Sequence, residues 1–190
     1  MRPEQIRALE YLRDRGTRAP LAQIRAGVAD AFAAFEAAVA ALDAENARAC
    51  PLPGEWTVHE VVDHLVETHR PSIVELRDLL AGHAPAGPAI PAGLQSAAPL
   101  ARPWDSLCAE LRALHAETLA VLDGARDDLP LTARAPIVMV INVPEADGRR
   151  VPLHWEEPLD WKAYAIVFRL HVLDHLGQVR RLLGAARRSA

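Results

Sequence analysis

Two histidines near the end of the chain have the spacing of metal ligands carried on one helix. His171 and His175 lie four residues apart in the segment FRLHVLDHLGQV, so both fall on one apolar stripe of a helix. The other members of that stripe are Tyr164, Phe168, Val179 and Leu182. Burying two imidazoles is costly unless each has a polar partner, and one divalent ion can serve both. Two core histidines bonded to nearby hydroxyls, carbonyls or carboxylates are the alternative interpretation.

A third ligand must come from another helix, and the segment after Trp56 offers His59, His64 and His69. On an ideal helical wheel, His69 lies nearer the middle of the apolar stripe, and His64 lies on its flank. That stripe is formed by Val58, Val62, Leu65, Ile73 and Leu76. Periodicity alone therefore leaves both His64 and His69 open as the third ligand. His59 and Asp63 lie on a different face and are interpreted as a surface pair.

Three neutral histidines leave a divalent ion with its full charge and with open positions. Such an ion lowers the pKa of a bound water toward neutrality, or polarises a thiol or a carbonyl. A hydrolase also needs a general base, for which Glu60, Glu67 and Glu156 are the available carboxylates, although no motif marks any of them. The segment from His154 to Glu157 either lines the mouth of the pocket or is a solvated loop. No GxSxG motif or glycine-rich phosphate loop is present, which disfavours serine-nucleophile and nucleotide chemistry.

The elements that must position these residues are predicted to be mostly helices, because their apolar residues recur with helical periodicity. A capping box of Thr57 and Glu60 predicts where the histidine-rich second long helix begins, and Pro71 interrupts that helix and can kink it. Helices are predicted over residues 3–15, 21–42, 58–80 and 103–124, and from 158 or 159 to about 185. Together they predict an all-α fold: a four-helix bundle with an extra N-terminal helix.

Two segments depart from this helical pattern. Prolines and glycines exclude regular structure from residues 82–103, which must cross the bundle or act as a flap. Residues 136–155 are rich in β-branched side chains, and Asp147-Gly148 can turn the chain. A short β-hairpin inserted before the last helix is predicted there, with an irregular extended loop as the alternative.

The composition bounds the class of protein. With 190 residues, of which 51% are apolar and only 5% aromatic, the chain is predicted to be one helical domain over residues 1–190, with its core at about 20–186. A net charge of −4 disfavours nucleic acid and anionic membranes as partners. Cys50 and Cys108 form no CxxC motif, and no apolar run approaches the length of a membrane span. A cytoplasmic location is therefore expected.

The two histidine motifs, taken in order, resemble the DinB/YfiT-like family of metal-dependent helical-bundle enzymes. In that family a tryptophan and a helix cap precede a His-Leu pair, which here reads WTVHEVVDHL and gives His64. The last helix of the family carries His-x-x-x-His-x-x-Gln, which here reads HVLDHLGQ and gives His171, His175 and Gln178. The resemblance implies a metal site at His64, His171 and His175 that holds nickel, zinc or iron, with Gln178 beside it to bind a ligand.

The same resemblance implies a metal-dependent enzyme that acts on a small molecule. A transferase that uses a low-molecular-weight thiol and a hydrolase are the two reaction types expected, and a homodimer is the expected assembly. The alternative is a non-catalytic, metal-stabilised bundle that acts in binding or in a stress response. An enzyme requires an open coordination position facing a cavity, whereas the alternative predicts a fully ligated metal.

Overall fold

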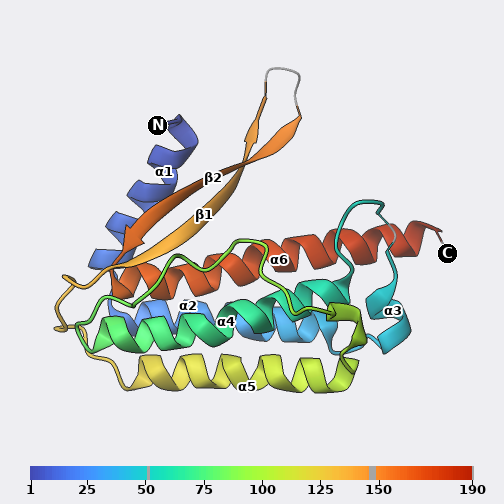
Figure 1. The fold of residues 1–190 in the computed structure, drawn as a ribbon, viewed down its shortest axis with the longest axis horizontal. Coiled ribbons are helices and arrows are strands. Elements are labelled where there is room, and N and C mark those ends of the chain that lie inside the picture. The colour runs from blue at the N-terminus through green and yellow to red at the C-terminus, as the bar shows by residue number, and fades with distance from the viewer. Residues whose placement is uncertain (51, 146–148, 190) are drawn as a thin grey trace.

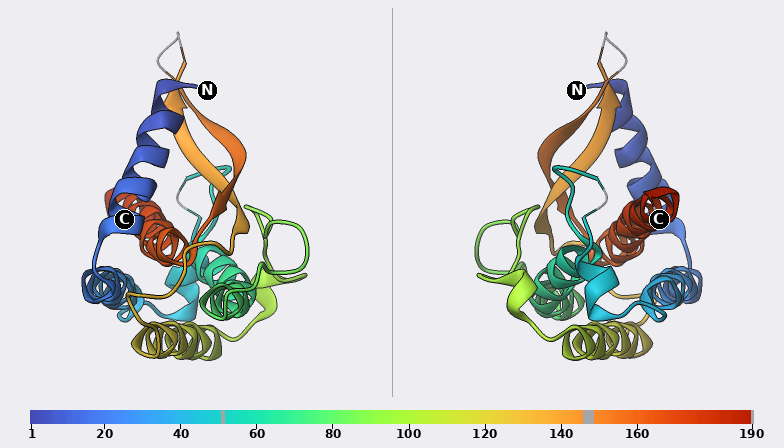
Figure 2. Two further views of the ribbon diagram at one scale, coloured as in Figure 1. Left: turned by 90° about the vertical axis from the view of Figure 1, so that its left-hand side faces the viewer. Right: turned by 90° about the vertical axis from the view of Figure 1, so that its right-hand side faces the viewer.

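Four long helices form the body of the molecule. The structure is a computed structural model that describes residues 1–50, 52–145 and 149–189. The long helices are α2 (Leu21–Val39), α4 (Val58–Leu80), α5 (Trp104–Asp123) and α6 (Trp161–Ser189). Helix α2 packs against α5 and α6, and α4 packs against the same two helices, which closes a four-helix bundle (Figures 1 and 2). The predicted all-α bundle is therefore confirmed.

A second layer lies on one side of the bundle (Figure 1). It consists of α1 (Pro3–Tyr11), a π-helical turn, η1 (Leu12–Gly16), and the antiparallel strands β1 (Ala135–Pro144) and β2 (Arg150–Leu159). A Cβ atom on Gly16 would lie 3.0 Å from the Cα of Ala163, so glycine allows this layer to approach α6. The predicted hairpin is confirmed, but its predicted Asp147-Gly148 turn lies outside the described residues.

Helix α4 begins at the predicted capping box. The Thr57 hydroxyl accepts a hydrogen bond from the Glu60 N–H at 3.1 Å, and the Glu60 carboxylate accepts one from the Thr57 N–H at 2.7 Å. The helix continues through Pro71 without a break in its assignment, up to Leu80. Thirteen of its residues are buried, and they include the three histidines His59, His64 and His69.

The last helix begins later than predicted. Strand β2 continues to Leu159, and Asp160 caps α6 by accepting a hydrogen bond from the Ala163 N–H at 3.0 Å. The other carboxylate oxygen of Asp160 accepts a bond from Arg134 at 2.7 Å, which ties the start of α6 to the residue before β1. Position 158 or 159 is therefore wrong as the helix start, because strand pairing extends to Leu159.

The long segment between α4 and α5 is irregular apart from one 3-10 turn, η2 (Pro99–Ala101). It returns along the bundle, so that α4 and α5 run in the same direction (Figure 1). A short helix that the sequence did not predict, α3 (Ala44–Arg48), lies before α4 and contacts it. In the described part of the chain, no helix combines the length and the apolar character that a membrane span requires.

Candidate metal centre

Three histidine side chains from two helices meet inside the bundle. The Nε2 atom of His171 lies 2.9 Å from the Nε2 atom of His64 and 3.1 Å from that of His175. His64 is 1% exposed, His175 is 9% exposed, and His171 is partly buried. Among the residues that the structure describes, these three histidines form the cluster that can hold a metal ion, and no carboxylate or thiol joins it.

Hydrogen bonds on the far side of two rings fix where their protons lie. His64 Nδ1 is 2.7 Å from the carbonyl oxygen of Leu94, which can only accept, so this nitrogen must donate. His175 Nδ1 likewise faces the amide oxygen of Gln178 at 2.9 Å. Both Nε2 atoms therefore present lone pairs toward His171, which is the tautomer that metal ligands adopt.

These contacts fit a shared cation better than a hydrogen-bonded trio. A neutral His171 carries at most one hydrogen on Nε2, so it cannot satisfy the lone pairs of both neighbours. Ligand nitrogens held at about 2.1 Å from one ion, at tetrahedral or octahedral angles, lie about 3.0–3.4 Å apart. The two Nε2 separations that involve His171, 2.9 and 3.1 Å, are close to that range, and the three ligand atoms all lie within 4.8 Å of one another. The donor set therefore fits a divalent ion.

Burial keeps the three rings neutral. Removal from water, and then the neighbouring His175, lowers the pKa of His64 from its ordinary value to about 4. The same desolvation lowers the pKa of His171 well below its ordinary value and also lowers that of His175. Since an imidazole must be neutral to bind a metal, the site is ready for an ion at neutral pH.

Zinc affinity is consequently expected to be almost independent of pH near neutrality. Between about pH 8 and pH 6 we expect the dissociation constant to change by less than about threefold, because rings with lowered pKa release no proton to the ion. Three histidines with the ordinary pKa of about 6.5 would weaken binding roughly 60-fold over this interval. Calorimetric titration in weakly coordinating buffers measures the change, and a fall of that larger size would contradict the buried, neutral site.

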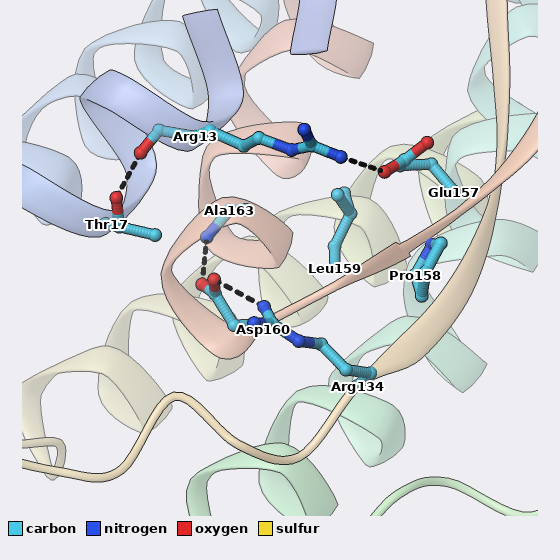
Figure 3. A pocket seen from close by; sticks show the side chains of 8 residues that line it. All are labelled: Arg13, Thr17, Arg134, Glu157, Pro158, Leu159, Asp160 and Ala163. Carbon is cyan, nitrogen blue, oxygen red and sulfur yellow. Dashed lines mark hydrogen bonds and ion pairs between the residues drawn. The ribbon is translucent and has the colours of Figure 1, made fainter. Parts of the chain in front are cut away.

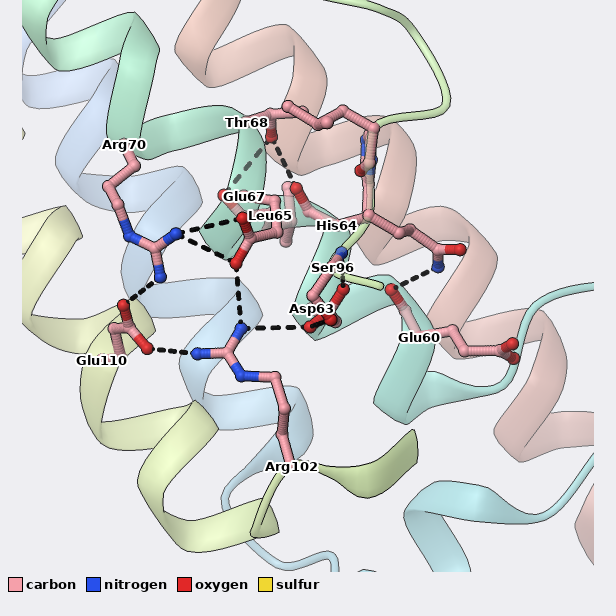
Figure 4. A network of polar contacts seen from close by, with 12 residues as sticks. Glu60, Asp63, His64, Leu65, Glu67, Thr68, Arg70, Ser96, Arg102 and Glu110 are labelled. Atoms are coloured by element: carbon pink, nitrogen blue, oxygen red, sulfur yellow. Dashed lines mark hydrogen bonds and ion pairs between the residues drawn. The ribbon is translucent and has the colours of Figure 1, made fainter. Parts of the chain in front are cut away.

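A polar network holds the irregular segment against α4 (Figure 4). The backbone N–H and the hydroxyl of Ser96 each donate to the carboxylate of Asp63 at 2.8 Å. Arg102 donates to the same carboxylate at 3.0 Å, and Asp63 is fully buried. Since Leu94 lies two residues before Ser96, this anchor positions the carbonyl that orients His64.

Gln178 and Trp56 contact the ring of His175. Gln178 accepts a hydrogen bond from His175 and donates one to the Glu55 carboxylate at 3.4 Å. The ring of Trp56 lies nearly parallel to that of His175, with centroids 6.2 Å apart, and 5.0 Å from that of His64. The family resemblance predicted that Gln178 binds a ligand beside the site, and its hydrogen bonds in the structure go to His175 and Glu55. Glu55 was not predicted, because it lies in a loop with no periodic signal.

The remaining histidines lie outside the cluster of three. His69 and His115 are buried with their ring centroids 5.4 Å apart, and His69 lies 5.9 Å from the His171 ring. His154 is exposed on β2, and His83 is exposed after α4. The structure thus brings His64, rather than His69, together with His171 and His175.

The interpretation of His59 and Asp63 as a surface pair is wrong. Both side chains are fully buried, because the irregular segment and α3 cover the face of α4 that carries them. His59 Nδ1 accepts a bond from Arg48 of α3 at 3.2 Å, and its ring meets the edge of Trp104.

The three carboxylates considered as general bases are placed differently. Glu67 forms ion pairs with Arg70 and Arg102, at 3.0 and 3.1 Å. Glu60 is engaged in the cap of α4, and Glu156 is exposed on β2. Glu55 is the carboxylate that hydrogen bonds connect to the cluster, through Gln178.

A hollow of about 350 Å³ lies where the hairpin joins α6 (Figure 3), but it includes none of the three histidines. Its charged side chains are paired with one another: Arg13 with Glu157 at 3.3 Å, and Arg134 with Asp160 at 2.7 Å. Because these pairs leave no free charge for a ligand, the histidine cluster is the better candidate site.

Comparisons with known proteins identify the fold and the family of the chain. A solved structure of YfiT from Bacillus subtilis, described as a probable metal-dependent hydrolase with an unusual four-helix bundle topology, has a TM-score of 0.59 to this chain. The two sequences are 17% identical, and the match covers 86% of this chain and 87% of the YfiT chain, which shows a shared fold. No curated protein matches the sequence. The sequence profile of the DinB superfamily matches residues 28–179, and the chain therefore belongs to the DinB superfamily.

Proposed function

We propose that the chain is a metal-dependent enzyme that binds a nickel, zinc or iron ion through His64, His171 and His175. The observation that carries this is the convergence of three imidazole nitrogens inside the bundle, whose lone pairs the protein cannot all satisfy. A divalent ion held there supplies a Lewis acid, which lowers the pKa of water and polarises a thiol or carbonyl of a small substrate. Hydrolysis, and transfer to or from a low-molecular-weight thiol, are the reaction types that this chemistry serves.

The residues around the cluster have separate roles in this proposal. Leu94 and Gln178 hold the rings of His64 and His175 in one orientation, and Trp56 shields them from solvent. The Glu55 carboxylate polarises the amide of Gln178, and the more negative amide oxygen that accepts from His175 Nδ1 makes that ring a stronger ligand.

Three ligands favour an enzyme over the alternative, a non-catalytic bundle stabilised by its metal. Structural zinc sites are closed by four protein ligands, whereas catalytic sites use three and keep a position open. In the described residues the cluster contains three histidines, and His171 also borders a small cavity. The homodimer, the cytoplasmic location and the single domain over residues 1–190 stay predictions.

Activity of the metal-loaded protein tests the proposal. We expect hydrolysis of a small ester, or consumption of a cellular thiol with an electrophile, to depend on one divalent ion per chain. His64→Ala should lower this activity by at least about 100-fold, because loss of a hydrogen-bond partner of a metal ligand alone costs about 10–100-fold in activity or metal affinity. The matched control is His154→Ala, which replaces an exposed histidine and should leave activity unchanged.

Ester hydrolysis or thiol transfer that survives in both His64→Ala and the chelated protein would contradict the proposed enzyme. Binding of one ion per chain with no turnover on either substrate panel would instead favour the metal-stabilised bundle.

A further inference from the structure

A small cavity with polar side chains in its lining lies beside the histidine cluster. A cavity of about 30 Å³ lies where α4, α6 and β1 meet. It is lined by residues of three elements: His69 and Ser72 of α4, Tyr164, Val167, Phe168 and His171 of α6, and Ile137 of β1. A cavity needs roughly 10–15 Å³ of such space for one water molecule, so there is room for a small polar group.

His69 is the unusual member of this lining. The side chain is 1% exposed, and neither of its ring nitrogens has a hydrogen-bond partner in the described protein. Rings of Phe32, Phe168 and His115 surround it, with centroids 5.7, 5.2 and 5.4 Å away. Buried polar groups are almost always bonded, so an orphaned imidazole at a cavity indicates a partner that is not protein.

The other polar atoms of the lining define which partner fits. Tyr164 donates its hydroxyl proton to Glu75 at 2.5 Å, and Ser72 donates its own to the Thr68 carbonyl at 2.8 Å. Both oxygens can therefore only accept a further bond. A neutral His69 offers one N–H donor and one acceptor nitrogen, so the lining holds more acceptors than donors and no free charge.

A hydroxyl group matches this arrangement. It can accept from the His69 N–H and donate to the other ring nitrogen or to a hydroxyl oxygen of the lining. A carboxylate or a phosphate only accepts, so it would meet one donor among several acceptors in a buried, apolar setting. The cavity is also too small for more than the end of a molecule.

We propose that this cavity is a subsite for one uncharged hydroxyl group, supplied by water in the free protein and by a hydroxyl of the substrate in the complex. The second half of this inference rests on the proposed function, because His171 belongs to both the cavity and the proposed metal centre. A substrate hydroxyl bound here would hold the molecule beside the ion.

Nuclear magnetic resonance of the metal-free protein, labelled with ¹⁵N in its histidine rings, tests the subsite directly. We expect cross-peaks between long-lived water and the His69 ring protons. Added methanol should replace them with methanol cross-peaks, whereas acetate at the same concentration should not. Because the ion is absent, failure of the metal centre leaves this measurement intact.

Three variants distinguish the loss of hydrogen bonds from a change in the volume of the cavity. His69→Phe keeps a ring but removes both nitrogens, and it should weaken methanol binding by roughly tenfold or more. His69→Gln restores a donor and an acceptor and should recover most of the affinity. Ser72→Ala, a milder change that removes one acceptor, gives a second readout if His69→Phe does not fold.

The matched control is His59→Phe. His59 is a buried histidine with an unpaired Nε2 that does not line the cavity, so this variant should bind methanol as the unchanged protein does. A dry cavity, undiminished binding in His69→Phe, or equal binding of acetate would each overturn the subsite. Water that methanol cannot displace would overturn its role for a substrate.

Discussion

Replacing either His171 or His175 with alanine should weaken the binding of zinc or nickel by more than about 100-fold. Each substitution removes one of the three proposed ligands, so that only two imidazole nitrogens remain to hold the ion. Calorimetric titration of the metal-free variants, with metal analysis of the purified proteins, measures both affinity and stoichiometry. The double variant should bind no ion tightly.

The control for this loss is His83→Ala, since His83 is exposed and lies outside the cluster. Its affinity for zinc should match that of the unchanged protein within about twofold. Undiminished affinity in the double variant His171→Ala/His175→Ala would mean that the ion binds elsewhere in the chain.

Replacing Asp63 with alanine should lower the free energy of unfolding by about 2–4 kcal/mol. The fully buried carboxylate accepts two bonds from Ser96 and one from Arg102, so its loss leaves these donors without their acceptor. The same variant should weaken zinc binding by about 10–100-fold, because Leu94 would no longer be held against His64. Chemical denaturation and calorimetric titration measure the two effects.

The matched control is Glu117→Ala, which removes an ion pair with Arg77 that lies in solvent, at 42% and 52% side-chain exposure. That change should alter stability by no more than about 0.5 kcal/mol and leave zinc affinity unchanged. If Asp63→Ala lost stability but bound zinc as tightly as the unchanged protein, the irregular segment would have no role in orienting His64.

The part of the site carried on α6 is readable from the sequence. His171 and His175 are close because one helical period fixes their separation, and Tyr164 and Phe168 of the same stripe are buried as predicted. The helical periodicity of the long helices and the capping box of α4 follow from the same local rules, since each depends on residues only a few positions apart.

The third histidine of the cluster could not be predicted from periodicity in this way. A helical wheel ranks His69 above His64 only if one face of α4 is buried, but the irregular segment buries the opposite face as well. The same cover explains why His59 and Asp63 are internal rather than on the surface. Family resemblance pointed to His64 because it compares whole motifs rather than burial.

Contacts between residues far apart in the sequence could not be predicted either. Glu55 meets Gln178 across 123 positions of sequence, and no periodicity connects a loop residue to a helix so far away. The start of α6 was misplaced for a related reason, because Leu159 pairs with Ala135 and the strand therefore takes residues that resemble a helix start.

The most direct test of the metal centre is a crystal structure of the protein grown with zinc or nickel, using anomalous scattering to locate the ion. We expect one ion bound by the Nε2 atoms of His64, His171 and His175, with solvent in its remaining positions. An ion bound by His69 in place of His64, or closed by a fourth protein side chain, would contradict the open three-histidine centre.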